Sequence, residues 1–276
     1  MGVTRLSLGV EHFDDAILES NGRAHGAKEI PKAYAFARQV GFPQINIDLI
    51  AGMMGETTET WRTCVARALD LLPDSITVYQ MEIPFNTTFY KQMTREGGVP
   101  PTADWDTKHG WLDYAFAEFE RAGYSISSAY TVVRSPATRF VYRDALWHGA
   151  DMIGIGVSSF GKINGVHLQN EKDIARYTAA VGEGDLPLQR AMPMSGEEQL
   201  IREFILQMKL GRIDAPYFAG KFSVDVRRRF AAPLERLERA GHVTLSDDGV
   251  RLTRSGLLRV DALLGEFFLP EHRNVA

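Results

Sequence analysis

The sequence has 276 residues, of which 45% are hydrophobic and 24% charged, and its formal net charge is −4. This composition is typical of a globular protein that can bury a core without disulfides or structural metal, and the mild negative charge excludes nucleic-acid binding through overall positive charge. No apolar run approaches the roughly 20 residues of a membrane span, and the first residues lack the apolar segment of a signal peptide, so we expect a cytoplasmic protein.

The first half of the chain alternates short apolar strands with amphipathic helices. Strands are predicted over residues 5–10, 45–50 and 75–81, and helices over residues 13–19, 27–40, 58–71 and 105–122. Alternation of this kind predicts right-handed βαβ units with a parallel sheet. We expect two further strands near residues 125–133 and 152–157, and a long connection over residues 84–101. Three such units do not close a barrel.

The pattern changes after residue 193. Ser195 is predicted to begin a helix, and two further helical patterns follow it. Two alternating segments around Asp247-Asp248-Gly249 predict a hairpin over residues 242–253, and a last helix is expected over residues 254–268. Helices, a short hairpin and a closing helix predict a small winged-helix-like domain. We therefore divide the chain into residues 1–192 and 193–276.

The sequence contains one cysteine, Cys64. One thiol cannot form an internal disulfide, and by itself it cannot hold a structural zinc or an iron–sulfur cluster. Because Cys64 lies in a helical pattern, we expect a small buried residue. No metal ligands are predicted, and no Ser/His/Asp or paired-carboxylate arrangement identifies catalytic residues.

Three segments place polar residues or glycines directly after an apolar strand. They are residues 8–15 with Asn21-Gly22-Arg23, residues 46–57, and residues 151–159. In a parallel α/β barrel the carboxyl ends of the strands meet at one mouth, where ligands bind, and a carboxylate that leaves a buried strand needs a partner. The alternative is structural, with Asp48 capping the next turn and the glycines only turning the chain.

These segments, in this order, resemble the coproporphyrinogen III oxidase-like branch of the radical S-adenosylmethionine (SAM) superfamily. That family typically reads Leu-Ser-Leu-Gly-Val-Gln-Ser-Phe, then an Arg, then Asn-Ile-Asp-Leu-Ile-Tyr-Gly, a strand ending in Tyr-Gln-Leu, and Gly-Ile-Gly-Ala. The resemblance implies an α/β fold: the second half of a radical SAM (β/α) barrel, followed by a winged-helix-like C-terminal domain. The Cys-x-x-x-Cys-x-x-Cys loop of the family is absent, so we expect a fragment that is inactive alone.

The resemblance also implies cofactor-binding residues. Arg23 is expected near the SAM carboxylate and Asp48 at the ribose hydroxyls, while Gly154 and Gly156 would shape the wall on the adenine side. Glu11 stands where the family usually has Gln. A carboxylate can accept a hydrogen bond from a hydroxyl but cannot donate one as an amide does.

The function implied is that of a radical SAM enzyme of tetrapyrrole metabolism, which decarboxylates propionate side chains of coproporphyrinogen III oxidatively. Its cofactors would be SAM and a [4Fe–4S] cluster whose ligands this chain lacks. The expected partners are a tetrapyrrole substrate and an upstream half-chain, or a second copy of the chain joined through the open barrel edge. We expect neither membrane nor nucleic acid as a partner.

Two alternatives use the same scaffold: a haem chaperone or haem-binding protein, and a radical SAM methyltransferase. In the first, His12 or His167 would be the haem ligand, although either can be an ordinary hydrogen-bonding residue. A third alternative is a DNA-binding regulator that uses the arginines at 227–229, which also suit a solvated helix face. We expect the aromatic side chains of Tyr142, Trp147 and Phe160 in the core rather than stacked on a porphyrin.

Overall fold

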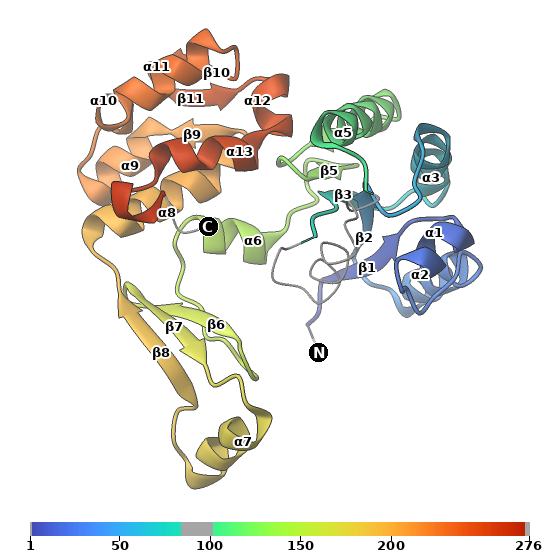
Figure 1. Cartoon of the computed structure of the whole chain (residues 1–276), viewed down its shortest axis with the longest axis horizontal. Coiled ribbons are helices and arrows are strands. Elements are labelled where there is room, and N and C mark those ends of the chain that lie inside the picture. Colours follow the sequence, from blue (N-terminus) through green and yellow to red (C-terminus); the bar gives the residue numbers. More distant parts are fainter. Residues whose placement is uncertain (1, 84–101, 274–276) are drawn as a thin grey trace, which may run out of the picture. The chain divides into compact units, whose positions relative to one another are not determined.

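Figure 1 shows the computed structural model, which describes residues 2–83 and 102–273. By its internal contacts the chain divides into two compact units, Met1–Arg139 and Phe140–Ala276. The predicted division into residues 1–192 and 193–276 stays a prediction, and the predicted connection over residues 84–101 lies outside the described residues. Within those described ranges no helix is both long enough and apolar enough to cross a membrane.

The first unit is an α/β fold with one sheet. Its elements are β1 (Arg5–Glu11), α1 (Asp15–Ser20), α2 (Glu29–Val40), β2 (Gln44–Ala51), α3 (Thr58–Asp70), β3 (Ser75–Gln80), α5 (Trp105–Arg121), β4 (Ser125–Ile126) and β5 (Thr131–Val133). The strand order is β1-β2-β3-β5-β4. Strands β1, β2 and β3 are parallel, and they alternate with helices that lie along one side of the sheet in Figure 1, which confirms the predicted βαβ arrangement.

The single strand predicted over residues 125–133 is wrong. The segment forms a hairpin instead, in which β4 and β5 are antiparallel and β5 is also antiparallel to β3. The chain reverses because the backbone N–H groups of Ser127 and Ser128 both donate to the carbonyl of Thr131. A reversal within so few residues leaves only an antiparallel pairing open to the two strands.

Local signals define the helices of this unit as predicted. Asp14, Thr57 and Asp104 cap the N-termini of α1, α3 and α5 with their side chains, which satisfies backbone N–H groups that have no partner within the helix. The apolar side chains between helices and sheet are almost fully buried: Ile45, Ile47, Leu49, Trp61, Ile76, Val78, Phe116 and Phe119. The free thiol of Cys64 lies in the same core, which confirms the expectation of a small buried residue.

The second unit begins with α6 and a small antiparallel sheet. Its elements here are α6 (Val141–Trp147), β6 (Phe160–Ile163), β7 (Val166–Asn170), α7 (Ile174–Glu183) and β8 (Leu188–Pro193). The strand predicted over residues 152–157 is wrong, because only an isolated bridge joins Met152 to Lys162. Gly156 has φ +98°, and a Cβ on Gly154 would lie 2.5 Å from the carbonyl oxygen of Phe160. Here the backbones approach too closely for a ladder of ordinary residues.

The rest of the second unit confirms the winged-helix-like prediction. Its elements are α8 (Gly196–Met208), β9 (Arg212–Asp214), α9 (Ala215–Phe222), α10 (Val226–Arg229), α11 (Ala231–Arg239), β10 (Val243–Ser246), β11 (Gly249–Leu252), α12 (Arg254–Leu258), α13 (Val260–Leu264), η1 (Gly265–Phe267) and η2 (Pro270–His272). Ser195 and Glu198 form a capping box at α8, and β10 and β11 form the predicted hairpin. The last helix, predicted as continuous, is interrupted at Arg259.

An aromatic cluster forms the core of the winged-helix-like part. The ring of Phe204 lies 5.8 Å from that of Phe218, 4.5 Å from that of Phe230 and 4.9 Å from that of Phe267, measured between centroids. All four side chains are buried. Aromatic pairs at these separations add stabilisation beyond the burial of their surface, so one cluster of rings holds together α8, α9, the junction between α10 and α11, and η1.

The second unit tests two expectations from the sequence, one about the burial of aromatic side chains and one about the exposure of the arginines at 227–229. Tyr142 is 59% exposed and Phe160 is 52% exposed, so the prediction that they lie in the core is wrong. Helix α6 buries none of its residues, and Phe160 stacks on His167 at the surface instead. Arg227 is paired with Asp247, 3.2 Å away, as expected of a solvated helix face.

Candidate functional site

A row of polar side chains crosses the sheet of the first unit on the face opposite its apolar core. The register places Ser7, Asn46 and Ser75 side by side on β1, β2 and β3, and places Asp48 beside Thr77. Because side chains alternate along a strand, all five lie on one face. Buried polar groups are costly without partners, so this row needs an internal network of hydrogen bonds.

Asn46 is the centre of that network and is fully buried. Its Nδ2 donates to Ser7 Oγ and to Asp48 Oδ1, each at 2.8 Å. Its Oδ1 accepts from Ser75 Oγ at 2.8 Å and from Thr77 Oγ1 at 3.0 Å. These four contacts use the whole hydrogen-bonding capacity of an amide, so Asn46 fixes the position of the Asp48 carboxylate.

Asp48 is the half-buried carboxylate at the end of this row. Burial raises its pKa, hydrogen bonds from Asn46 and Ser7 and the charge of Arg5 lower it, and the charge of Glu11 raises it; the balance lies above the usual value. The negative form is therefore held in place but incompletely compensated. A carboxylate in that condition gains from additional hydroxyl donors.

Glu11 and Arg23 form a close ion pair at the carboxyl end of β1. Arg23 Nε lies 2.5 Å from Glu11 Oε2, and both side chains are partly buried. Glu11 has φ +66°, a conformation that is uncommon for a residue with a side chain, and its Oε1 lies 3.1 Å from where a Cβ on Gly9 would be. Gly9 is the register partner of Asp48, so the structure brings all three predicted polar residues to the same strand ends.

The turn after β2 is held by a buried carboxylate. Glu56 Oε2 accepts from the backbone N–H groups of Gly52, at 2.5 Å, and Met53, at 3.1 Å. His12 Nε2 lies 3.2 Å from Glu56 Oε1, while His12 Nδ1 accepts from the N–H of Asp14. Both ring nitrogens of His12 therefore have partners inside the protein, which leaves this histidine without a coordinating position for haem.

Lys108 reaches the same end of the sheet from α5. Its side chain is buried, its Nζ donates to the carbonyl of Met81 at 2.8 Å, and burial lowers its pKa. Gly52 has φ +91°, and a Cβ there would lie 2.6 Å from Lys108 Cε. Glycine is required at this turn both by its backbone conformation and by the lysine that passes over it.

Comparison with known proteins agrees with this architecture. Residues 194–259 match the family described as the HemN C-terminal domain. The chain is 26% identical over 96% of its length to the haem chaperone HemW of Bacillus subtilis, and 28% identical over 96% to oxygen-independent coproporphyrinogen III oxidase of Helicobacter pylori.

The fold is shared with a solved structure. The radical SAM enzyme coproporphyrinogen III oxidase (HemN) of Escherichia coli matches 96% of this chain with a TM-score of 0.79 and 23% identity. The chain resembles the coproporphyrinogen III oxidase-like radical SAM family over nearly its whole length. It spans 70% of the HemW relative, 61% of the H. pylori relative and 64% of the E. coli chain.

The remaining predicted site residues, Gly154 and Gly156, precede the HemN C-terminal domain and lie in the second unit. Asn170 Nδ2 donates to the carbonyls of both glycines at 2.9 Å, and the N–H of Gly156 donates to Tyr177 Oη at 3.0 Å. These contacts fix the segment against β7 and α7. Their role as a cofactor wall stays a prediction.

A [4Fe–4S] cluster does not fit the residues present. Cys64 is buried within α3, and burial raises the pKa of its thiol. The described parts of the chain hold no group of three or more His, Cys, Asp or Glu side chains suited to a metal ion. A cluster needs several thiolates at one place, so its ligands are not among these residues.

The prediction from sequence missed Asn46, Ser7 and Lys108. Three of the four hydrogen-bond partners of Asn46 lie 29 to 39 residues away along the chain, and they meet Asn46 only through the register of the strands. One signal was available for Asn46: it stands two residues before Asp48 in a strand, and therefore on the same face.

Proposed function

We propose that this chain contributes SAM-binding strands and the HemN C-terminal domain to a radical SAM enzyme of tetrapyrrole metabolism. The observation that carries the proposal is the meeting of Glu11, Arg23 and Asp48 at the ends of β1 and β2, within a fold shared with the E. coli enzyme. The reaction proposed is the one for which the H. pylori relative is named, oxidative decarboxylation of coproporphyrinogen III. The proposed location is the cytoplasm.

In this proposal Asp48 accepts hydrogen bonds from the ribose hydroxyls of SAM. Asn46 Nδ2 donates to Asp48 Oδ1 and holds the carboxylate in place, and burial raises the pKa of Asp48. Arg23 meets the SAM carboxylate, for which a guanidinium is the best-suited partner. Because Glu11 already forms an ion pair with Arg23, Glu11 competes with the SAM carboxylate for the guanidinium and weakens SAM binding.

In the whole protein, a [4Fe–4S] cluster would supply the electron that cleaves SAM. The three thiolates that hold it must come from residues outside this sequence, which has one cysteine. After anaerobic reconstitution with iron and sulfide, we expect no cluster on this chain. Iron and sulfide analysis that finds about four of each per chain would contradict this expectation.

Calorimetric titration of the chain with SAM tests the site directly. Without a cluster we expect millimolar affinity, about 4 kcal/mol of binding free energy. Asp48→Ala should weaken binding about tenfold, because the ribose hydroxyls lose a charged acceptor. Glu11→Gln should strengthen binding about twofold to fivefold, the equivalent of one partly exposed ion pair. Glu59→Gln is the control, because it removes an exposed carboxylate from α3.

Asp48→Ala should weaken SAM binding and Glu11→Gln should strengthen it. A general loss of folding cannot produce changes in affinity of opposite sign. Equal SAM affinity in Asp48→Ala and in the Glu59→Gln control would overturn the site. Weaker binding in Glu11→Gln would show that Glu11 itself contacts SAM, in place of competing for Arg23. Circular dichroism of each variant establishes that its fold is retained.

Strand β1 is an edge of the sheet among the described residues. An unpaired edge offers backbone groups for another strand. We propose that the edge is covered by strands from an upstream half of the protein or, in their absence, by a second copy of the chain. Sedimentation of the isolated chain should then show association, and a monomer at all concentrations would contradict self-association.

Haem binding is the second candidate, and an apolar groove in the second unit favours it. The groove has a volume of about 230 Å³ and is lined by Met192, Met194, Glu198, Ile201, Arg202, Ile205, Phe268, Leu269 and His272. Nη1 of Arg202 is buried without a hydrogen-bond partner. Beside it, His167 is the cross-strand partner of Met192, and its ring stacks on Phe160. Burial and the charge of Arg202 lower the pKa of His167, which favours the neutral imidazole that binds iron.

Titration with haem separates the two candidates. If haem binds here, His167→Ala should abolish the shift of the Soret band, and Arg202→Gln should weaken affinity about tenfold through loss of a propionate partner. His25→Gln, a half-exposed histidine of the first unit, is the control. Haem binding that survives His167→Ala would exclude this groove.

A further inference from the structure

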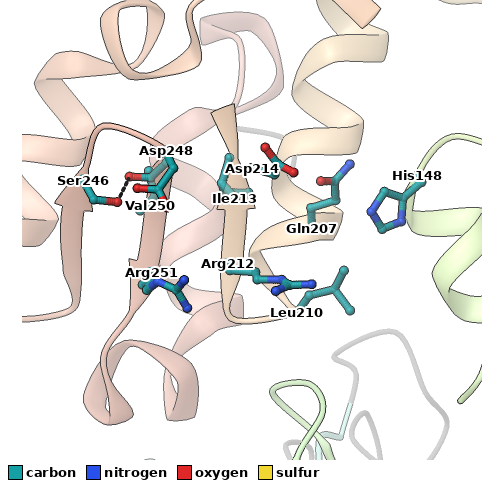
Figure 2. Close-up of a pocket in the computed structure, with 11 residues that line it drawn as sticks. His148, Gln207, Leu210, Arg212, Ile213, Asp214, Ser246, Asp248, Val250 and Arg251 are labelled. Atoms are coloured by element: carbon teal, nitrogen blue, oxygen red, sulfur yellow. Dashed lines mark hydrogen bonds between the residues drawn. The ribbon is translucent and has the colours of Figure 1, made fainter. Parts of the chain in front are cut away.

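A polar cavity of about 280 Å³ lies in the second unit, between α8, β9 and the β10–β11 hairpin (Figure 2). Its polar groups do not converge on one point. The amide of Gln207 lies beside the Asp214 carboxylate and away from the two arginines of the lining, and a hydrogen bond from Ser246 and the charge of Arg251 lower the pKa of Asp248. In the first unit, by contrast, buried polar groups converge on the turn after β2.

Asn21 holds this turn from the end of α1. Its Oδ1 accepts from the backbone N–H of Met54 at 3.0 Å, and its Nδ2 donates to the carbonyl of the same residue at 3.1 Å. Nδ2 also donates to the Ile17 carbonyl within α1, at 2.8 Å. One amide therefore joins the end of a helix to a turn that lies 33 residues further along the chain. Arg23 follows Asn21 by two residues, so this contact also restricts where Arg23 lies.

His12 holds the same turn from the end of β1, through Glu56. The two side chains are 1% and 0% exposed. The N–H of Asp14 donates to His12 Nδ1 at 3.0 Å, so Nδ1 carries no proton and the ring proton is on Nε2. Nε2 lies 3.2 Å from Glu56 Oε1, while Glu56 Oε2 accepts from two backbone N–H groups of the turn. These contacts assign a neutral histidine beside a carboxylate.

The two attachments flank the ion pair between Glu11 and Arg23. Glu11 directly precedes His12, and it has φ +66° at the point where the register of β1 with β2 shifts. A conformation of this kind persists only where the surrounding structure holds it. The ion pair is therefore tied on both sides to the turn that follows β2, the strand that carries Asp48.

We propose that His12 and Asn21 are positioning residues of the SAM site, which hold Arg23 at the separation from Asp48 that bound SAM requires. This inference rests on the function proposed above, in which Asp48 meets the ribose and Arg23 meets the carboxylate. SAM is then contacted at both ends. A displacement of one end lowers the affinity for SAM even though each contacting group keeps its own chemistry.

The test compares SAM with 5′-methylthioadenosine, which keeps the adenine and ribose of SAM but lacks its amino-acid end. NMR titration of the full chain measures both affinities. His12→Asn keeps an acceptor for the N–H of Asp14 but does not reach Glu56. It should weaken SAM binding about fivefold and methylthioadenosine binding less than about twofold. Asn21→Leu, which removes the contacts to Met54, should give the same difference between the ligands, whereas a general structural loss would weaken both alike.

His12→Gln is the rescue variant, because glutamine places an N–H donor at the reach of Nε2. Its affinity for SAM should return to within about twofold of the parent chain. Gln39→Leu, at an exposed position on α2, is the control for Asn21→Leu and should leave both affinities unchanged. In the parent chain without ligand, nitrogen NMR of the His12 imidazole should show a proton on Nε2 and none on Nδ1.

Equal losses of affinity for both ligands, or unchanged SAM affinity in both His12→Asn and Asn21→Leu, would overturn the inference, as would a proton on Nδ1 of His12. If His12→Asn does not fold, Asn21→Leu at its partly exposed position and the nitrogen spectrum of the parent chain still decide the question. Asp48→Ala separates the two proposals. If it weakens the binding of both ligands, the SAM site stands whatever the positioning variants show, whereas unchanged affinity in Asp48→Ala would remove the site and this inference together.

Discussion

The two units of the chain bury their central side chains in opposite ways. In the first unit, one face of the sheet holds a row of polar groups around Asn46, which is fully buried and makes four side-chain hydrogen bonds. In the second unit, the centre is a cluster of phenylalanines around Phe204. Hydrogen bonds have fixed directions and numbers, whereas apolar contacts require only shape and volume.

We infer from this difference that the polar network of the first unit positions a side chain, whereas the phenylalanine cluster of the second unit supplies stability. A satisfied polar network contributes little net free energy, because folding exchanges hydrogen bonds with water for internal ones. It does, however, fix the Asp48 carboxylate to one place. The phenylalanine cluster gains free energy from every buried ring and places no reactive group. We therefore expect losses in the second unit to lower stability most, and losses in the first unit to alter the site.

The largest effect is expected from Phe204→Ala. Removal of a fully buried ring at the centre of the cluster should lower the free energy of unfolding by about 3–5 kcal/mol. Chemical denaturation of the chain measures it. Phe36→Ala is the control, because Phe36 is 67% exposed and its loss should change stability by less than about 0.5 kcal/mol. Similar losses in both variants would contradict the cluster as the main source of stability.

Asn46→Leu should have the next largest effect, about 2–3 kcal/mol. The substitution leaves the hydroxyls of Ser75 and Thr77 without their acceptor and Asp48 without its amide donor. Gln39→Leu is the control, because it also replaces an amide side chain with leucine but at an exposed position on α2. If Asn46→Leu were as stable as the control, the polar row would have no energetic role.

Asp74→Asn tests a polar anchor at the other end of the same sheet. Although burial raises its pKa, hydrogen bonds from Arg38 and the N–H of Ile45, with the charges of Arg38 and Arg134, hold the pKa of Asp74 below its usual value. Since Arg38 and Arg134 are 33% and 45% exposed, we expect a loss of only about 1 kcal/mol at pH 7.

The pH dependence of that loss has a definite sign. A carboxylate with a lowered pKa stabilises the fold above the pKa of the unfolded chain, and this contribution disappears as the pH falls through the folded value. The difference in melting temperature between parent and Asp74→Asn should therefore shrink in acid. A difference independent of pH would show that the charge of Asp74 is not its source.

The smallest effect, and the only stabilising one, is expected from Asp48→Asn. Because the pKa of Asp48 is raised, mainly by burial, its ionised form opposes folding, and this loss of stability sets in as the pH rises through the folded pKa. At pH 7 the neutral amide should raise stability by about 0.5 kcal/mol while weakening SAM binding. In acid the gain in melting temperature should vanish, and destabilisation at pH 7 would contradict the account.

Much of the fold followed from local sequence. Ser195 with Glu198 predicted a capped helix and the structure confirms it, and Asp247-Asp248-Gly249 predicted the hairpin of β10 and β11. The single cysteine is too few to hold a [4Fe–4S] cluster by itself, which composition alone establishes. Each of these conclusions rests on residues within one turn of chain or on composition alone, so no distant contact could change it.

Other features were decided only by tertiary structure. The strand expected over residues 125–133 folded back as a hairpin, the pairing of Arg23 with Glu11 joined residues from a strand and a later loop, and Asn46 gained its partners from strand register. Register is set by the packing of whole strands and helices against one another. Sequence therefore determined which groups this protein can use, and the packing of distant segments determined which of them meet.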